Sequence, residues 1–219
     1  MIIQGAIFDM DGTLVDSLGI WEVLWERIGI AFGYGKGFRP AAEDDRQART
    51  MLLADVTEMI HQKYGLGNSG KELLEFTNQE MVRFYAEELE PKAGTLAYLA
   101  YLKEQGVPMC VASATAGDLV QIAVKRCGID RYIDTFISCA DVGKGKEEPD
   151  VFLAALEKLG TEKEKTCVFE DSYVALKTAA EAGFLTVGIH DCHTFDHDKL
   201  EQTATIYIRE GETLEKLIK

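Results

Sequence analysis

The chain opens with a short apolar run that ends in carboxylates. Ile2, Ile3 and residues 6–8 are apolar, and the polar stretch that follows begins at Asp9. A short apolar run with a sharp polar boundary is typical of a strand buried in the interior of a sheet. We therefore predict that the first strand of the protein lies at the centre of its sheet.

Helical periodicity dominates the next part of the chain. Apolar residues recur at helical spacing between positions 21 and 28, and Ser17 is a candidate N-cap for that helix. Two further helical patterns cover residues 51–64 and 71–88, and a glycine-containing loop separates them. No convincing strand pattern occurs among these segments, so the sequence predicts a helical unit over residues 16–90.

Strand and helix patterns alternate after this unit. The predicted strands cover residues 107–112, 135–138, 166–169, 185–189 and 205–208. The predicted helices cover residues 95–105, 117–127, 149–159, 173–182 and 212–218, and a polar loop is predicted before the last strand. Such alternation implies βαβ units and a mostly parallel sheet. We therefore expect an α/β, doubly wound, Rossmann-like core over residues 1–15 and 91–219, with the helical unit inserted into it.

Composition narrows the range of partners and compartments. The chain has 219 residues and a formal net charge of −14, which disfavours a nucleic-acid partner and an anionic membrane surface. Its five cysteines are widely spaced and contain no C-x-x-C pair, as is usual in a reducing compartment. The N-terminus lacks a basic region before its apolar run. We expect a cytoplasmic protein without a nucleic-acid partner or a membrane association.

Polar side chains follow several of the predicted strands at the point where each strand ends. They are Asp9, Asp11, Ser113, Thr115, Glu170 and Asp171, and Lys146 lies in a glycine-containing loop after the 135–138 strand. Ligands of doubly wound sheets bind beyond the carboxyl ends of the strands, so we expect these groups to gather at one edge. Neighbouring carboxylates raise one another's pKa, and a hard cation such as Mg²⁺ would remove that conflict. Ordinary turn chemistry at each strand end is the simpler alternative, but it does not explain why the groups complement one another.

These segments resemble the motifs of a known family, in the same order along the chain. Residues 9–13 resemble the nucleophile loop of the haloacid dehalogenase superfamily, in the branch with a helical cap inserted after that loop. Residues 111–113 resemble its second motif, and residues 169–172 resemble its acidic metal motif. Residues 146–150 resemble its lysine motif, although Glu147 stands where many relatives have proline.

The resemblance implies a role for each matching residue. Asp9 would attack phosphorus and form an aspartyl-phosphate, and Asp11 would act as general acid and then as general base. Lys146 would offset negative charge, and Ser113 would donate a hydrogen bond to a phosphoryl oxygen. The implied phosphate-binding set is Asp9, Met10, Asp11, Ser113, Ala114 and Lys146. The implied ligands of Mg²⁺ are Asp9, Glu170, Asp171 and the backbone carbonyl of Asp11.

Other residues offer competing assignments. Lys144 could take the place of Lys146, but the position of Pro149 and Asp150 favours Lys146. The candidate zinc ligands are His190, Cys192, His193 and His197, but their irregular spacing favours a polar loop. An anion-binding role in the cap is conceivable for Arg39, Arg46 and Arg49, although solvated charges are the simpler interpretation.

The resemblance implies a Mg²⁺-dependent phosphatase that acts on a small phosphorylated metabolite. A sugar-phosphate mutase resembling β-phosphoglucomutase is the alternative within the fold. Trp21 stands where such mutases carry a cap histidine, and Ala116 and Gly117 stand where they carry basic or amide residues. A non-catalytic phosphometabolite sensor is the alternative from another class, and the complete set of motifs favours the enzyme. We expect a monomer or a weak homodimer.

Overall fold

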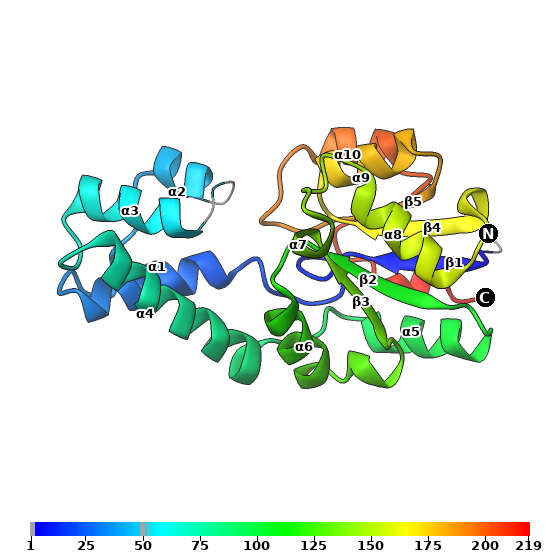
Figure 1. Cartoon of the computed structure of the whole chain (residues 1–219), viewed down its shortest axis with the longest axis horizontal. Helices are drawn as coiled ribbons and strands as arrows, with labels where there is room; N and C mark the ends of the chain where they lie inside the picture. Colours follow the sequence, from blue (N-terminus) through cyan, green and yellow to red (C-terminus); the bar gives the residue numbers. More distant parts are fainter. Residues whose placement is uncertain (1–2, 49–50, 52) are drawn as a thin grey trace. The chain divides into compact units, whose positions relative to one another are not determined.

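A computed structural model describes residues 3–48, 51 and 53–219 (Figure 1). The chain divides into two compact units, one of Met1–Ser17 and Leu89–Lys219 and one of Leu18–Glu88. The second unit begins and ends two residues inside the predicted range 16–90. Ile2 of the predicted first strand and the candidate anion-binding Arg49 lie outside the described residues.

The first unit is built on a six-stranded parallel sheet. Its strands are β1 Gly5–Phe8, β2 Met109–Ser113, β3 Thr135–Ser138, β4 Thr166–Glu170, β5 Leu185–Ile189 and β6 Ile206–Ile208. The strand order is β3-β2-β1-β4-β5-β6, with every neighbouring pair parallel. The prediction of a doubly wound parallel sheet with β1 near its centre is therefore confirmed.

The residues of β1 are buried on both faces of the sheet. Ile7 is paired with Cys110 of β2 and with Val168 of β4. Its neighbour Phe8 points to the other face, because successive side chains of a strand alternate. There the ring of Phe8 stacks on that of Phe169 at a centroid distance of 4.3 Å. A continuous apolar run was thus the right signal for this central strand.

Helices cover both faces of this sheet. They are α5 Thr95–Glu104, α6 Gly117–Arg126, α7 Cys139–Val142, α8 Asp150–Leu159, α9 Tyr173–Glu181 and α10 His197–Thr203, with short 3₁₀ helices at Ile129–Arg131, Lys163–Lys165 and Leu214–Leu217. Figure 1 shows α5 and α6 on one face and α8, α9 and α10 on the other. The prediction of a polar loop before the last strand is wrong at α10, whose only buried side chain, Leu200, gives too weak a periodic signal. None of the described helices is long and apolar enough to cross a membrane.

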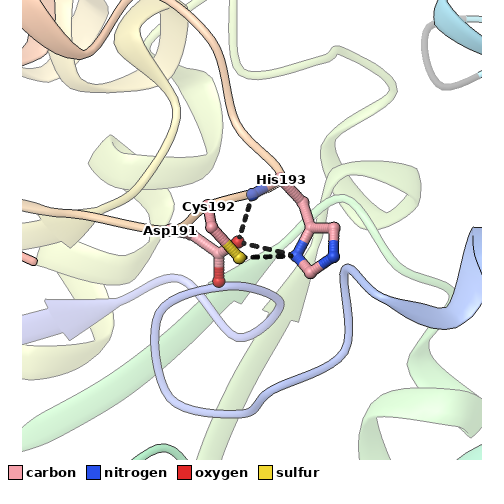
Figure 2. Close-up of side chains that lie close together, drawn as sticks. All are labelled: Asp191, Cys192 and His193. Carbon is pink, nitrogen blue, oxygen red and sulfur yellow. Dashed lines mark hydrogen bonds and ion pairs between the residues drawn. The ribbon is translucent and has the colours of Figure 1, made fainter.

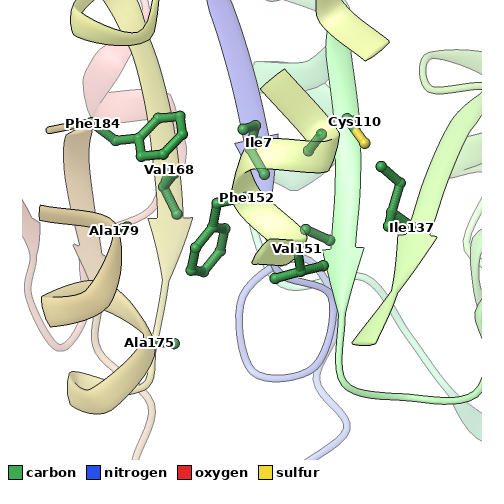
Figure 3. Packing of buried hydrophobic residues seen from close by; sticks show 11 residues of the cluster. Ile7, Cys110, Ile137, Val151, Phe152, Val168, Ala175, Ala179 and Phe184 are labelled. Carbon is green, nitrogen blue, oxygen red and sulfur yellow. The ribbon is translucent and has the colours of Figure 1, made fainter. Parts of the chain in front are cut away.

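One hydrophobic core of this unit lies between the sheet and the helices α8 and α9. Val151 and Phe152 of α8 are fully buried and pack against Ile7 of β1 and Val168 of β4 (Figure 3). Phe184, just before β5, closes the cluster with its ring centroid 6.4 Å from that of Phe152. This packing anchors α8, and so also the loop that precedes it, to the central strands.

The second unit is helical. It contains α1 Ile20–Ala31, α2 Ala42–Ala48, α3 Leu53–Tyr64, α4 Gly70–Arg83 and a five-residue π-helical segment, Phe84–Glu88. Its own core includes Trp25, whose indole N–H donates to Asp45 over 2.6 Å. The predicted N-cap Ser17 is wrong, because α1 begins after Gly19 and the Ser17 hydroxyl is buried without a hydrogen-bond partner.

The two segments that connect the units are paired with each other. Val15 forms an antiparallel bridge with Pro91. The amide of Asp16 donates to the carbonyl of Glu90, and the amide of Lys92 donates to the carbonyl of Leu14, each over 3.0 Å. The chain therefore leaves the first unit and returns to it along one short antiparallel ladder.

Candidate active site

The candidate site lies at the carboxyl ends of neighbouring strands. Asp9 follows β1, Ser113 ends β2 and Glu170 ends β4, and both of those strands pair with β1. The order of the strands reverses between β1 and β4, and such switch points hold the ligands of doubly wound sheets. The topology therefore brings together groups that are far apart in the sequence.

The loop after β1, residues 9–15, is a tight turn, and we call it the nucleophile loop after the family motif that residues 9–13 resemble. The carbonyl of Met10 accepts hydrogen bonds from the amides of Leu14 and Val15, over 2.9 and 3.0 Å. Gly12 has a φ of 76°, a left-handed conformation that glycine adopts without strain. Its amide donates to the carbonyl of Val15 over 3.0 Å. These bonds fix the direction in which the loop presents Asp9 and Asp11.

Lys146 lies between two carboxylates of this site. Its ammonium forms an ion pair with Oδ1 of Asp9 and another with Oε1 of Glu170, the latter over 2.6 Å. The loop before α8 carries Lys146, and the ammonium lies 5.9 Å from the ring centroid of the core residue Phe152. Lys144 is exposed. Of the two competing lysines, the structure therefore places Lys146 beside Asp9.

Asp9, Glu170 and Asp171 form a compact cluster of oxygen ligands. Their carboxylate oxygens lie within 4.8 Å of one another, and the three residues are at most 6% exposed. One lysine cannot neutralise three buried carboxylates. Hard divalent cations prefer oxygen ligands, so this donor set fits Mg²⁺. The carboxylate of Asp11 is not part of this cluster.

The electrostatics of the cluster show the same shortage of positive charge. Burial raises the pKa of Asp9 to about 8, the charges of Glu170 and Asp11 act in the same direction, and Lys146 opposes them. Burial, together with the neighbouring carboxylates, also raises the pKa of Asp171 well above its ordinary value. Burial disfavours the charged form of Lys146, but the charges of Asp9 and Glu170 outweigh this effect and raise its pKa. A cation bound among the carboxylates would relieve their repulsion.

Two threonine hydroxyls orient acidic side chains of the site. Thr115 donates from Oγ1 to Oδ2 of Asp11 over 2.7 Å, and its amide donates to Oγ of Ser113 over 3.0 Å. Thr13 donates from Oγ1 to Oδ1 of Asp171 over 3.1 Å. The sequence analysis placed Thr115 among the polar groups at the strand ends, but neither threonine's contact could be predicted, because both contacts depend on how the strands are ordered.

Met10 and Ala114 have a different relation to the site. The side chain of Met10 is fully buried in the core, and Ala114 is an exposed residue directly after β2. Neither side chain carries a polar group. Any contact of theirs with a phosphate would therefore be made by the backbone.

A second group of possible metal ligands follows β5. The ligand atoms of Asp191, Cys192 and His193 lie within 4.8 Å of one another (Figure 2). Oδ1 of Asp191 accepts a hydrogen bond from the amide of His193 over 2.9 Å, and its Oδ2 pairs with Lys92 over 2.6 Å. His197 contacts the carbonyl of Asp191 through Nε2 over 2.9 Å. These contacts engage Asp191 within a structured turn before α10, which favours the polar-loop interpretation for residues 190–193 over a zinc site.

Comparison with known proteins identifies the family. A family model described as haloacid dehalogenase-like hydrolase matches residues 3–183. The chain belongs to the haloacid dehalogenase-like hydrolase family. The resemblance inferred from the motifs is therefore confirmed, and the protein is an enzyme of this hydrolase family.

Curated relatives agree with this family, and a solved structure has the same fold. A phosphorylated carbohydrates phosphatase of Thermotoga maritima is 26% identical over 226 residues, and the match covers 98% of each chain. Hexitol phosphatase A of Escherichia coli is 26% identical over 189 residues, with 85% of this chain and 83% of the relative covered. A crystal structure from Thermotoga maritima that bears a provisional β-phosphoglucomutase name has a TM-score of 0.84 at 24% identity, over 98% of each chain. The haloacid dehalogenase-like family and its named phosphatases support hydrolysis of a phosphate ester.

Proposed function

We propose that the chain is a Mg²⁺-dependent phosphatase that hydrolyses a small phosphorylated metabolite through an aspartyl-phosphate on Asp9. One observation carries the proposal. Lys146 bridges Asp9 and Glu170 at a buried strand edge where Asp171 completes a set of oxygen ligands. A carboxylate nucleophile needs nearby positive charge to approach an anionic phosphate, and this arrangement supplies one cation and a site for another.

The carboxylate cluster supports a set of residues that would hold the metal. Asp9, Glu170 and Asp171 would contribute carboxylate oxygens, and the family resemblance adds the backbone carbonyl of Asp11. When bound, Mg²⁺ would supply positive charge that offsets the charges of Asp9 and of the substrate phosphate. The donors are all oxygen, which favours Mg²⁺ over a metal that prefers nitrogen or sulfur ligands.

In the first step, a carboxylate oxygen of Asp9 attacks phosphorus and the bond from phosphorus to the ester oxygen breaks. Asp11 gives its proton to the departing oxygen. In the second step, Asp11 takes a proton from water, the water oxygen attacks phosphorus, and the bond from Asp9 to phosphorus breaks. Lys146 and Ser113 would donate hydrogen bonds to phosphoryl oxygens in both steps. Such assistance by position and charge is what phosphoryl transfer requires of a protein.

The substrate proposed is a phosphorylated carbohydrate or sugar alcohol. The names of the Thermotoga maritima and Escherichia coli relatives support this class. We propose that residues 1–15 and 91–219 form the catalytic core and that the helical insert, residues 16–90, is the cap that selects the substrate. The entry of the insert directly after the nucleophile loop supports that role.

A phosphate-release screen with Mg²⁺ present tests this function. The panel contains hexose phosphates, hexitol phosphates and other small phosphate esters, and the Asp9→Asn variant is the matched control. We expect release of inorganic phosphate from at least one carbohydrate phosphate by the wild type and none above background by the variant. A rearranged sugar phosphate without free phosphate would identify a mutase. Binding of a phosphorylated sugar without any conversion would identify a sensor.

A further inference from the structure

Lys92 makes a set of contacts that the proposed mechanism does not use. Its ammonium donates to the carbonyl of Gly12 over 2.8 Å and to Oδ2 of Asp191 over 2.6 Å. It also lies 3.4 Å from the carbonyl of His190. The side chains of Lys92 and Asp191 are 20% and 4% exposed. The lysine thus joins the nucleophile loop to the loop after β5.

We propose that Lys92 is a positioning residue of the nucleophile loop. Together with Asp191, it fastens the turn at Gly12 and so holds Asp9 and Asp11 in place for phosphoryl transfer. The catalytic part of this inference rests on the proposed phosphatase function. The structural part, that Lys92 and Asp191 restrain the loop, does not depend on the phosphatase function.

The position of Gly12 makes its carbonyl an effective point of attachment. Gly12 directly follows Asp11 and lies at the left-handed bend of the loop. The hydrogen bonds inside the loop set its curvature, whereas Lys92 ties it to Asp191 in the loop after β5. The backbone of Lys92 adds a second attachment, because its amide donates to the carbonyl of Leu14 over 3.0 Å. Small displacements of reacting groups lower phosphoryl-transfer rates strongly, so an attachment here has a direct effect on catalysis.

Asp191 is a suitable anchor for the other end of this contact. Burial alone would raise the pKa of its carboxyl group, but hydrogen bonds from Lys92 and from the amide of His193 outweigh burial and lower it. Thr194 donates from Oγ1 to the carbonyl of Asp191 over 2.9 Å, which fixes the turn that carries it. In Figure 2 one carboxylate oxygen of Asp191 faces His193 and the other faces the loop after β1. The anchor is therefore held by several hydrogen bonds, and these bonds favour the charged form of its carboxyl group.

A lysine near an active site could instead bind the substrate phosphate. The ammonium group has three protons to donate, and three protein oxygens surround that of Lys92. Because these oxygens occupy the donors of the ammonium group, Lys92 is better suited to restrain the loop than to bind the substrate. The two roles also predict different effects for Asp191. If Lys92 restrains the loop, neutralising Asp191 would weaken that restraint. If Lys92 binds the substrate phosphate, neutralising Asp191 would leave its affinity for phosphate unchanged or raise it.

The test compares Lys92→Met and Asp191→Asn with a matched control, Lys165→Met. Lys165 pairs with Glu162 over 2.8 Å and precedes β4, at the opposite edge of the sheet. Steady-state kinetics on the best carbohydrate phosphate are combined with hydrogen–deuterium exchange of peptides covering residues 9–16. We expect kcat to fall about tenfold in both test variants with KM little changed, because the reacting groups are displaced. We expect faster exchange in the loop peptides of both, and wild-type behaviour of Lys165→Met.

The outcomes separate this inference from the function on which it rests. Wild-type kcat with unchanged exchange in both test variants overturns it. A raised KM in Lys92→Met alone, with Asp191→Asn unaffected, also overturns it and makes Lys92 a phosphate ligand. If the wild type releases no phosphate, faster exchange in the variants still supports the restraint while the phosphatase proposal fails. The near-isosteric Asp191→Asn keeps the test decisive if Lys92→Met does not fold.

Discussion

The hydroxyl of Thr115 donates a hydrogen bond to Oδ2 of Asp11 over 2.7 Å and thereby joins the end of β2 to the nucleophile loop. Asp11 is the proposed acid and base of the reaction, so this contact sets the direction in which its carboxylate faces. The amide of Thr115 also donates to Oγ of Ser113. Thr115 therefore orients both Asp11, the proposed proton carrier, and Ser113, a proposed phosphate ligand.

Replacing this hydroxyl should affect proton transfer selectively. In Thr115→Val we expect kcat/KM to fall about tenfold for an alkyl phosphate and less for an aryl phosphate, because an aryl oxide leaves without much help from an acid. Thr115→Ser keeps a hydroxyl and should retain most of the activity. The measurement is kcat/KM for both substrates in each variant. Equal losses on both substrates would show that Thr115 does not act through Asp11.

Replacing each of the two aspartates of the nucleophile loop should block a different step of the reaction. Asp9→Asn has no nucleophilic carboxylate, so no covalent intermediate forms. Asp11→Asn leaves Asp9 free to attack, and with an aryl phosphate some phosphorylation should survive while hydrolysis of the intermediate stalls. Acid-quench mass spectrometry should therefore find a phosphate adduct on Asp11→Asn and none on Asp9→Asn. An adduct on the Asp9→Asn protein would assign the nucleophile to another residue.

Mg²⁺ should stabilise the protein more at pH 8 than at pH 6. Without an ion, the folded-state pKa of Asp9 is raised to about 8, above its value in the unfolded chain. The stability that the proton on Asp9 contributes is therefore full below about pH 4 and is lost as the pH rises toward 8. Mg²⁺ must displace that proton, so its apparent affinity rises over the same range. The measurement is the difference in Tm between Mg²⁺ and a chelator at each pH. Equal differences, or full turnover after exhaustive chelation, would contradict a metal among these carboxylates.

The packing of α8 on the sheet should dominate the stability of the first unit. Phe152 is fully buried in the cluster of Figure 3, so Phe152→Ala should lower the free energy of unfolding by about 3–5 kcal/mol. Its neighbour Leu153 is 42% exposed, and Leu153→Ala should cost less than about 1 kcal/mol. Urea unfolding of the two variants measures the difference. Similar losses for both would mean that the cluster does not hold α8 in place.

The sequence predicted those parts of the fold and the site that depend on local pattern. Parallel strands buried on both faces are continuous apolar runs, so β1 was recognisable from its composition alone. Asp9 and Asp171 directly follow β1 and β4, Glu170 is the last residue of β4, and a parallel sheet gathers such ends at one edge. The choice of Lys146 over Lys144 depended on a short motif, and the structure places Lys146 beside Asp9.

What could not be predicted depends on contacts between distant segments or on weak local signals. Lys92 and Asp191 meet only because the connection from the helical unit passes beside β5, and nothing near either residue in the sequence indicates the other. The short helix α2 has three acidic residues in its first turn and two buried side chains, too few for a periodic pattern. Serine is a residue type that often caps helices, but α1 begins three residues after Ser17.

The antiparallel ladder at Val15 and Pro91 makes the helical unit, seen from the core, equivalent to a very long hairpin loop. The hydrogen bonds from Asp16 to Glu90 and from Lys92 to Leu14 close the loop at its base, as a strand pair closes a turn. The entropy of closing a loop grows only slowly with its length. We therefore expect the core to tolerate inserts of different length between these two paired segments. If the insert selects the substrate, as proposed, replacement of this one segment would change the substrate and leave the residues of the proposed site as they are.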